Sequence, residues 1–396
     1  MRKIFATQVE IGMSLPCDIY NEQGVLLWTQ GSQIKTEQQV NKLVREGYRS
    51  DLQEWIPHKT GSKASDDSSE KPETLVEIEK TFVYETVLDA ILEIQLPLNY
   101  IFSVFNSDSF FKEKRLLTEQ IDAIIDVILD ICDKHPEEAI ATVHMNRQGK
   151  HSILNAIDKA IVAALCGKAI DLPIEEIRSI TSAALTANAC VIKLIETISK
   201  QTKITPLQQE ELNEAPANSL LLLTRCGVRD ELWLDAVYMQ KEKLNGAGVP
   251  RGLEGDDIST GGRILAIAEK YVSYILPNHT LRPTFDPATA LKRLFKKNRV
   301  IMDGNIMLAF VKQCGVIPPG SFVNLKDNGV GVVIKQNEDG SKPIVTKVGN
   351  DFSKLFTEFN LTTTLAIESI VRQPNDIHKR LFKLWAIHES NHPEAE

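Results

Sequence analysis

The feature that most constrains the fold of this chain is a long stretch of helical periodicity. Apolar residues recur at three- and four-residue spacing from Leu75 onward for about 240 residues, most clearly over residues 75–91 and 121–131. A pattern of this length needs one large shared core, because each amphipathic helix must bury its apolar face against another. We therefore predict a mainly α fold, an all-helical bundle, for most of the chain.

The helical pattern also carries boundary signals. Pro173 fits the first turn of a helix, Thr205 fits an N-cap with proline following it, and Asn245-Gly246 fits a helix end. After Pro318 the apolar period changes to two, which predicts a C-terminal β-hairpin at about residues 319–348 and then a short terminal helix. The helical domain with this hairpin is expected to span residues 75–396.

A different kind of sequence precedes the bundle. Residues 1–57 contain short β-like pieces, a turn and one helical segment that Thr36 is expected to cap, which together predict a small mixed α/β domain. Residues 58–74 are rich in Ser, Lys and Asp and cannot bury a core, so they are expected to form a linker.

Composition excludes several broad functions. The 396 residues carry a formal net charge of -8, which does not favour nucleic acid as a partner. The N-terminus lacks the apolar core of a signal peptide. The sequence contains no run of about 18 apolar residues, so we expect no membrane insertion. The six cysteines form no CxxC pair and are expected to be reduced thiols. A cytoplasmic protein is the resulting prediction.

One loop and the helix after it carry the most specific motif. Residues 245–253 read NGAGVPRGL, and residues 262–269 read GRILAIAE. Together they resemble the HD-GYP family, bacterial phosphodiesterases of cyclic di-GMP within the HD superfamily. His151-Ser152, Lys203-Ile204-Thr205 and the C-terminal hairpin extend the resemblance, and residues 1–57 are similar to the small domain often found ahead of such modules. The resemblance implies an HD-type helical fold and hydrolysis assisted by two or three metal ions.

Most residues at the family's site positions have changed. The HD dipeptide falls on Ala187 and Asn188, the following lysine on Val191, the histidine of an H-P pair on Ala215, and a carboxylate on Arg147. Two further histidines fall on Gln240 and Lys241, with Glu242 kept, and the aspartate that ends the RILAIAD helix becomes Glu269. The complete set of remnant site positions comprises His151, Ala187, Asn188, Val191, Ala215, Gln240, Lys241, Glu242, Asn245, Gly246, Gly248, Val249, Pro250 and Glu269.

These changes bear directly on metal binding. A metal ligand must donate a lone pair, and alanine and valine cannot. No histidine occurs between Ser152 and Asn278, which leaves His151, Glu242 and Glu269 as candidate ligands, while Lys241 would place a cation among them. We therefore expect no metal, no cofactor and no catalytic residue. Each of the three candidates also has an ordinary interpretation, as a helix-start histidine or an ion-paired carboxylate.

A second site of the family, a phosphate-contacting R-x-Y-R motif, falls on residues 278–281 and is not matched. Arg282 lies one residue beyond it, and a basic run including Lys292 and Lys296 follows. These three residues are candidate nucleotide contacts, although a solvated helix face explains the basic run equally simply.

Three functions stay open at this point. The first is a degenerate, non-hydrolytic protein that binds signalling proteins, which the sequence does not identify. The second is an effector that binds cyclic di-GMP without cutting it. The third is an active phosphodiesterase with a rearranged metal site.

Overall fold

The computed structural model describes residues 2–3, 12–21, 25–36, 39, 42–43, 47–49, 84–105, 114–276, 284–326, 329–337, 342–349, 367–371 and 379–385. The chain divides into two compact units. One contains Met1–Glu73 with Thr205–Glu211, and the other contains Thr74–Ile204 with Leu212–Glu396. The expected linker, residues 58–74, and Arg282 lie outside the described residues.

The first unit contains a small antiparallel sheet with the strand order β1-β4-β2-β3. Its strands are β1 (Arg2–Lys3), β2 (Ile19–Tyr20), β3 (Leu26–Trp28) and β4 (Tyr48–Arg49). A small apolar core supports it, made of Met13, Leu15, Cys17, Ile19, Ile34 and Leu43. This mixed unit agrees with the predicted fold class.

Capping bonds explain where the predicted helix of this unit begins. The hydroxyl of Thr36 accepts from the Gln39 backbone N–H at 3.3 Å, and the Gln39 side chain accepts from Thr36 N at 3.2 Å. Such a reciprocal pair satisfies two N–H groups that a helix start would otherwise leave unpaired. Thr36 therefore has the capping role expected from the sequence, and the described residues 39, 42 and 43 are helical.

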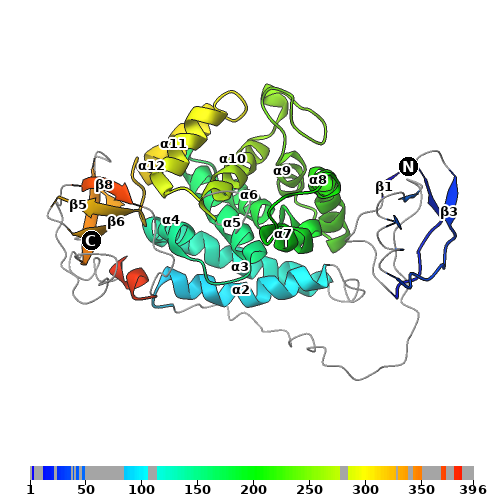
Figure 1. Cartoon of the computed structure of the whole chain (residues 1–396). Coiled ribbons are helices and arrows are strands. Elements are labelled where there is room, and N and C mark those ends of the chain that lie inside the picture. The colour runs from blue at the N-terminus through cyan, green and yellow to red at the C-terminus, as the bar shows by residue number, and fades with distance from the viewer. Residues whose placement is uncertain are drawn as a thin grey trace, which may run out of the picture. The chain divides into compact units, whose positions relative to one another are not determined.

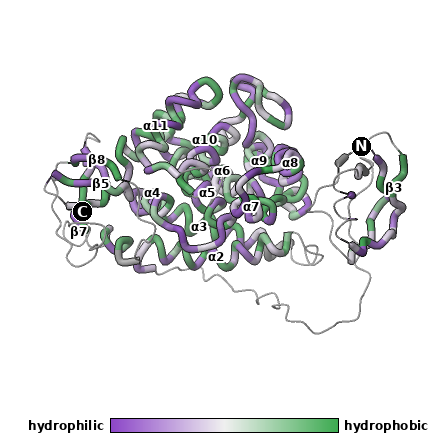
Figure 2. The backbone as a smooth tube through the Cα atoms, in the orientation of Figure 1, coloured by the Kyte–Doolittle hydropathy of each residue, from purple (hydrophilic) through white to green (hydrophobic). Residues whose placement is uncertain are grey.

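The second unit is the predicted helical bundle, and Figure 1 shows α5, α6 and α10 in its middle. Every residue of α5 from Ser152 to Gly167 is buried, so this helix forms the centre of the main core. Figure 2 shows hydrophilic and apolar residues alternating along the outer helices, as amphipathic helices around one core require. The helices are α2 (Val87–Val104), α3 (Lys114–Lys134), α4 (Pro136–Met145), α5 (His151–Ala169), α6 (Ile174–Thr186), α7 (Ile192–Ser199), α8 (Pro206–Cys226), α9 (Glu231–Met239), α10 (Thr260–Ile275), α11 (Pro287–Asn298) and α12 (Gly304–Cys314).

Two predicted helix starts are close to those observed, whereas the helix end predicted at Asn245-Gly246 is wrong, because α9 already ends at Met239 and a loop follows it. Thr205 caps α8 by accepting from Gln208 N at 3.2 Å, and Pro206 is the first helical residue, as predicted. Pro173 occupies the N-cap of α6, immediately before its first turn. The described residues also include three short 3-10 turns, Ala189–Val191, Gly255–Asp257 and Lys379–Lys383.

The C-terminal part forms an antiparallel sheet with the order β7-β6-β5-β8. Its strands are β5 (Phe322–Leu325), β6 (Val330–Gln336), β7 (Pro343–Gly349) and β8 (Ile367–Val371). The predicted period-two strands are confirmed, whereas β8, which pairs with β5, was not predicted. The expected terminal helix is a short 3-10 turn, and Trp385 just beyond it donates to the Ile334 carbonyl at 2.9 Å.

One helix within the described ranges, α2, is long and apolar enough to cross a membrane by length and composition. Of its apolar window, 56% is buried against other parts of the protein. Core helices of globular domains meet the same criterion, so this feature is weak evidence for a membrane span.

Candidate functional site

The helical unit brings most of the remnant site positions to two adjoining cavities. The larger, of about 580 Å³, is lined by His151, Asn188, Lys241 and Glu269, among others. The smaller, of about 430 Å³, is lined by Gln240, Glu242, Gly248 and Val249, and shares Lys241 and Glu269 with the larger. Residues from α5, the end of α6, the end of α9 and α10 therefore converge, as the resemblance implied.

Three of the changed positions are filled by apolar packing. Ala187, Val191 and Ala215 are each no more than 2% exposed. Val191 and Ala215 pack in one apolar cluster with Leu194 and Ile198, whereas Ala187 belongs to the main core. These side chains carry no lone-pair donor, so their contribution to the site is packing.

Gln240 is held by a neutral hydrogen bond to another changed position. Its side-chain Nε2 donates to the Ala187 carbonyl at 2.7 Å and to the Val237 carbonyl at 3.1 Å. By the resemblance, Gln240 and Ala187 both stand where the family carries ligand histidines. A hydrogen bond from a side-chain amide to a backbone carbonyl therefore connects the end of α9 to the end of α6, at two positions where the resemblance implies metal ligands.

Glu242 supports the loop that follows it. Its two carboxylate oxygens accept from the backbone N–H groups of Arg251 at 2.7 Å and Leu253 at 3.0 Å, and the residue is 3% exposed. A Cβ atom at Gly248 would lie 2.4 Å from Glu242 Cα, so the loop passes too close for any larger residue. Both oxygens of this retained carboxylate are thus committed to loop backbone.

The rest of the loop is arranged around that contact. Asn245 accepts from Ala247 N at 3.3 Å through its side chain and forms a backbone bridge with Glu254. Gly246 has a φ of +70°, a conformation that favours glycine, and Pro250 is exposed after a cis peptide bond. These remnant positions have structural roles.

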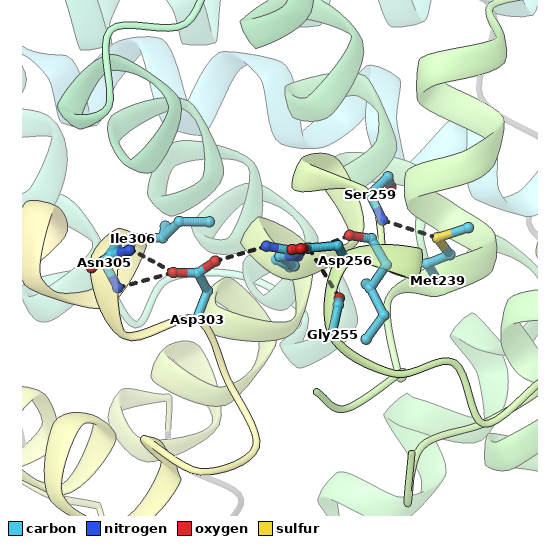
Figure 3. A network of polar contacts seen from close by, with 9 residues as sticks. Met239, Gly255, Asp256, Ser259, Asp303, Asn305 and Ile306 are labelled. Carbon is cyan, nitrogen blue, oxygen red and sulfur yellow. Dashed lines mark hydrogen bonds and ion pairs between the residues drawn. The ribbon is translucent and has the colours of Figure 1, made fainter. Parts of the chain in front are cut away.

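Arg263 in the GRILAIAE helix fastens the same loop to α12. It donates to Asp303 Oδ2 at 3.1 Å, to Asp256 Oδ1 at 2.9 Å and to the carbonyls of Gly255 and Ile258. Asp303 in turn caps α12 by accepting from Asn305 N and Ile306 N (Figure 3). Arg263, which belongs to the family motif, therefore holds the loop against α10 and α12 through hydrogen bonds and ion pairs.

A partly buried ion pair that the sequence did not reveal involves Glu269, which lines both cavities. Lys159 Nζ on α5 is 3.1 Å from Glu269 Oε2 on α10, and the Lys159 side chain is 3% exposed. Burial opposes ionisation of Glu269, but the charges of Lys159 and Lys241 outweigh it and hold the pKa of this carboxyl below its usual value. One signal could have revealed Lys159, because it is a lysine inside the apolar run ILNAIDKAIVAAL.

Lys241 is the second cation of the site. Its ammonium donates to the Leu212 carbonyl, which connects the end of α9 to α8. Burial lowers the pKa of Lys241 and so does the nearby charge of Lys159, while Glu269 acts in the opposite direction. The expectation that a lysine would place positive charge in the site is thus matched by two lysines.

The ionisable side chains of Arg147 and Asp158 interact electrostatically in the interior of the helical unit. Arg147 donates to the carbonyls of Asn146 at 2.6 Å and His144 at 2.7 Å. Burial lowers the pKa of Arg147 to about 10, and burial raises the pKa of Asp158 well above its usual value even though Arg147 opposes the increase. Burial therefore favours the neutral form of the Asp158 carboxyl.

Two histidines lie near this region with different surroundings. His151 is half-buried and lines the larger cavity at the start of α5. His144 is fully buried; Nδ1 donates to the Pro319 carbonyl at 2.6 Å, and Nε2 accepts from the Tyr271 hydroxyl at 2.7 Å. Burial lowers the pKa of His144 to about 3. His144 is thus a satisfied core histidine.

The candidate nucleotide contacts do not join the cavities. Lys292 and Lys296 are exposed on α11, and neither lines the larger or the smaller cavity. Their positions agree with the simpler interpretation of a solvated helix face.

The side chains present do not fit the metal cluster that the family implies. Glu242 is used by the loop backbone, Glu269 faces Lys159, and Ala187, Val191 and Ala215 offer no donor. Within the described part of the chain, no group of three or more His, Cys, Asp or Glu residues is arranged to hold a metal ion.

Comparison with known proteins agrees with this architecture. Residues 130–306 match the family model described as an HD domain. The chain is 23% identical over 234 residues to the cyclic di-GMP phosphodiesterase PA4108 of Pseudomonas aeruginosa, covering 58% of this chain and 56% of that protein. It is 22% identical over 189 residues to the cyclic di-GMP phosphodiesterase PdeB of Borreliella burgdorferi, covering 48% and 49%.

Residues 130–306 thus contain an HD domain, and the chain is similar in sequence to two cyclic di-GMP phosphodiesterases. The chain spans about half the length of the curated relatives it matches. A solved structure, the HDG"Y"P protein Bd1817 of Bdellovibrio bacteriovorus, is 13% identical with a TM-score of 0.43, covering 78% of this chain and 97% of that one.

Proposed function

We propose that this protein is a catalytically degenerate HD-GYP-like signalling protein that has no metal centre and acts by binding other signalling proteins. The observation that carries the proposal is the contact between Lys159 and Glu269, with Lys241 alongside. Ammonium groups here balance a carboxylate that the resemblance aligns with a metal ligand.

Electrostatics explain why these lysines oppose a metal. Two unit charges 4 Å apart interact by about 4 kcal/mol at an effective dielectric constant of about 20, and a divalent ion doubles that figure. A metal in this site would face repulsion from Lys159 and Lys241 and would also have to compete for Glu269. The few remaining donors could not compensate, since Glu242 is occupied by Arg251 and Leu253.

The fold does not need the metal for its stability. Apolar residues that replace a buried charged cluster are often neutral or favourable for folding, and Ala187, Val191 and Ala215 pack without polar atoms. A stable helical domain that no longer hydrolyses a substrate can still bind other signalling proteins, which is the role we propose. The proposed location is the cytoplasm, because scattered cysteines without a CxxC pair are typical of reduced thiols.

The test is turnover of cyclic di-GMP by the purified chain in added Mn²⁺ or Fe²⁺. We expect no linear dinucleotide above the background of buffer with metal alone. Sustained product formation that scales with protein concentration would overturn the proposal and favour a rearranged metal site built from His151, Glu242 and Glu269. Capture of partners from the source cells, compared with a denatured-protein control, then addresses the binding role.

A second candidate function is a non-hydrolytic cyclic di-GMP effector. The larger cavity favours it, since about 580 Å³ lies in the range of ligand sites and two lysines, Lys203 and Lys241, line it. Isothermal titration at tens of micromolar cyclic di-GMP separates the two candidates. Absence of heat would eliminate the effector hypothesis, and saturable binding without hydrolysis would favour it.

A further inference from the structure

Lys241 occupies a particular place between the two cavities. It lines both of them, together with Glu269 and Ser273. One proton of its ammonium is used by the Leu212 carbonyl, and an ammonium has three to donate. Two donors of Lys241 are therefore available for other acceptors.

The charges around the larger cavity do not balance. Glu269 is paired with Lys159, so that pair is neutral overall. Within the described ranges, neither Lys241 nor Lys203 has an ion-pair partner, and Lys203 is exposed on the cavity lining. Two positive charges thus face a cavity whose one lining carboxylate is already paired. A partly buried cation without a counter-ion is costly, and an anionic ligand would remove that cost.

The cavity wall suits an organic molecule with an anionic group at one end. Its apolar lining comes from Ile195, Ile198, Ile204, Leu212, Val272 and Leu276. The amide side chains of Asn155 and Asn188, both at most 9% exposed, line the same cavity. Asn188 hydrogen-bonds to Glu269, and since an amide has two N–H donors, each side chain can donate to a ligand oxygen. Apolar walls with a few convergent polar groups are typical of small-molecule sites.

We infer that the larger cavity binds an organic phosphate monoester directly on Lys241 and Lys203, with no metal ion between phosphate and protein. The inference rests on the proposed absence of a metal centre. A monoester carries a charge of about -1.5 to -2 at neutral pH and three acceptor oxygens, which matches two ammonium groups better than the single charge of a diester. The site therefore prefers a terminal phosphate to the cyclic diester that the family cleaves.

The experiment is isothermal titration of the full chain in EDTA with guanosine 5′-monophosphate, guanosine, inorganic phosphate and cyclic di-GMP. We expect the monophosphate to bind at least tenfold more tightly than guanosine and more tightly than cyclic di-GMP. Binding should weaken as salt concentration rises, because the contact is electrostatic. Equal affinity for monophosphate and guanosine, tighter binding of the cyclic diester, or no heat with any phosphate would overturn the inference.

Variants assign the binding to the cavity. Lys241→Gln removes the charge and keeps a donor for the Leu212 carbonyl, and we expect at least tenfold weaker binding of the monophosphate. Lys203→Gln, at an exposed position, should weaken binding severalfold and tests the same claim if Lys241→Gln does not fold. Lys312→Gln, on the exposed face of α12, is the matched control and should bind normally. Unchanged affinity in folded Lys241→Gln and Lys203→Gln would contradict the assignment.

The EDTA condition separates this inference from the proposed function. If the chain holds metal and loses monophosphate binding when the metal is removed, the proposed function fails and the inference fails with it. If the chain is free of metal and binds no phosphate monoester, the inference alone fails.

Discussion

Lys159 on α5 contacts Glu269 on α10 at 3.1 Å, and the two residues connect the central helix of the bundle to the helix of the family motif. Glu269 is a position where the resemblance expects a metal ligand, and Lys159 supplies the positive charge there. The same contact therefore serves two purposes. It gives the Glu269 carboxylate a counter-charge, and because that negative charge is neutralised, the carboxylate attracts a metal cation less strongly.

Breaking this ion pair on one side should destabilise the fold. Lys159→Met leaves Glu269 without its counter-charge, and we expect the free energy of unfolding to fall by about 2 kcal/mol, below the 3–5 kcal/mol of a fully buried pair because the Glu269 side chain is 37% exposed. Adding Glu269→Gln to that variant should restore part of the loss. Urea unfolding of both single variants and the double variant measures the coupling; additive effects would show that the pair is not an energetic unit.

Buried His144 should make stability depend on pH. Its pKa is about 3 in the folded protein and about 6.5 when unfolded, so between these values the unfolded chain binds one more proton. Stability contributed by the neutral ring is complete above pH 6.5 and is lost as pH falls toward 3. The slope attributable to His144 is about 1.4 kcal/mol per pH unit in that window.

The comparison that isolates this effect is the native chain against His144→Asn, unfolded in urea at several pH values between 6.5 and 5. The variant should lose stability at every pH because it loses the bonds to Pro319 and Tyr271. The difference between the two proteins should nevertheless shrink as pH falls. A difference that stays constant with pH would mean that His144 titrates normally in the folded state.

The loop after α9 should tolerate no side chain at Gly248. A Cβ there would lie 2.4 Å from the backbone of Glu242 and Lys243, so Gly248→Ala should cost about 1–3 kcal/mol of stability. Gly304→Ala is the matched control, since nothing lies within 4 Å of its Cβ position at the start of α12. Equal melting temperatures for the two variants would contradict the close contact.

Restoring the missing dipeptide should not restore catalysis. Ala187→His with Asn188→Asp introduces two side chains that can bind a metal. Gln240, Lys241 and Ala215 still replace histidines that the resemblance implies, and Lys159 still pairs with Glu269. We expect no hydrolysis of cyclic di-GMP in Mn²⁺ by the folded double variant. Measurable linear dinucleotide product would show that the remaining site can still assemble a metal centre.

Much of the fold follows from local patterns in the sequence. Helical periodicity predicted the bundle. Thr36 and Thr205 were predicted as helix caps, and in the structure Gln39 and Gln208 form reciprocal bonds with them. Strand β8 was missed, since its pairing with β5 depends on a partner more than 40 residues away along the chain.

In the site, too, features that are local in the sequence could be predicted, whereas contacts between separate helices could not. The loop and the changed ligand positions could be identified by reading along the chain, because the motif is continuous there. Lys159 and the bond from Gln240 to the Ala187 carbonyl could not, since each depends on how separate helices pack. A lysine within an apolar helix was the one visible sign of the ion pair.

Metal stoichiometry tests most directly whether the ammonium groups of Lys159 and Lys241 replace the metal ions that the resemblance implies. The purified full chain, loaded with Mn²⁺ or Fe²⁺ and then passed through a desalting column, is analysed for metal per chain. We expect far less than one bound ion per chain and an unchanged melting temperature after EDTA. One or more tightly bound ions per chain, with a melting temperature that falls on chelation, would contradict this expectation.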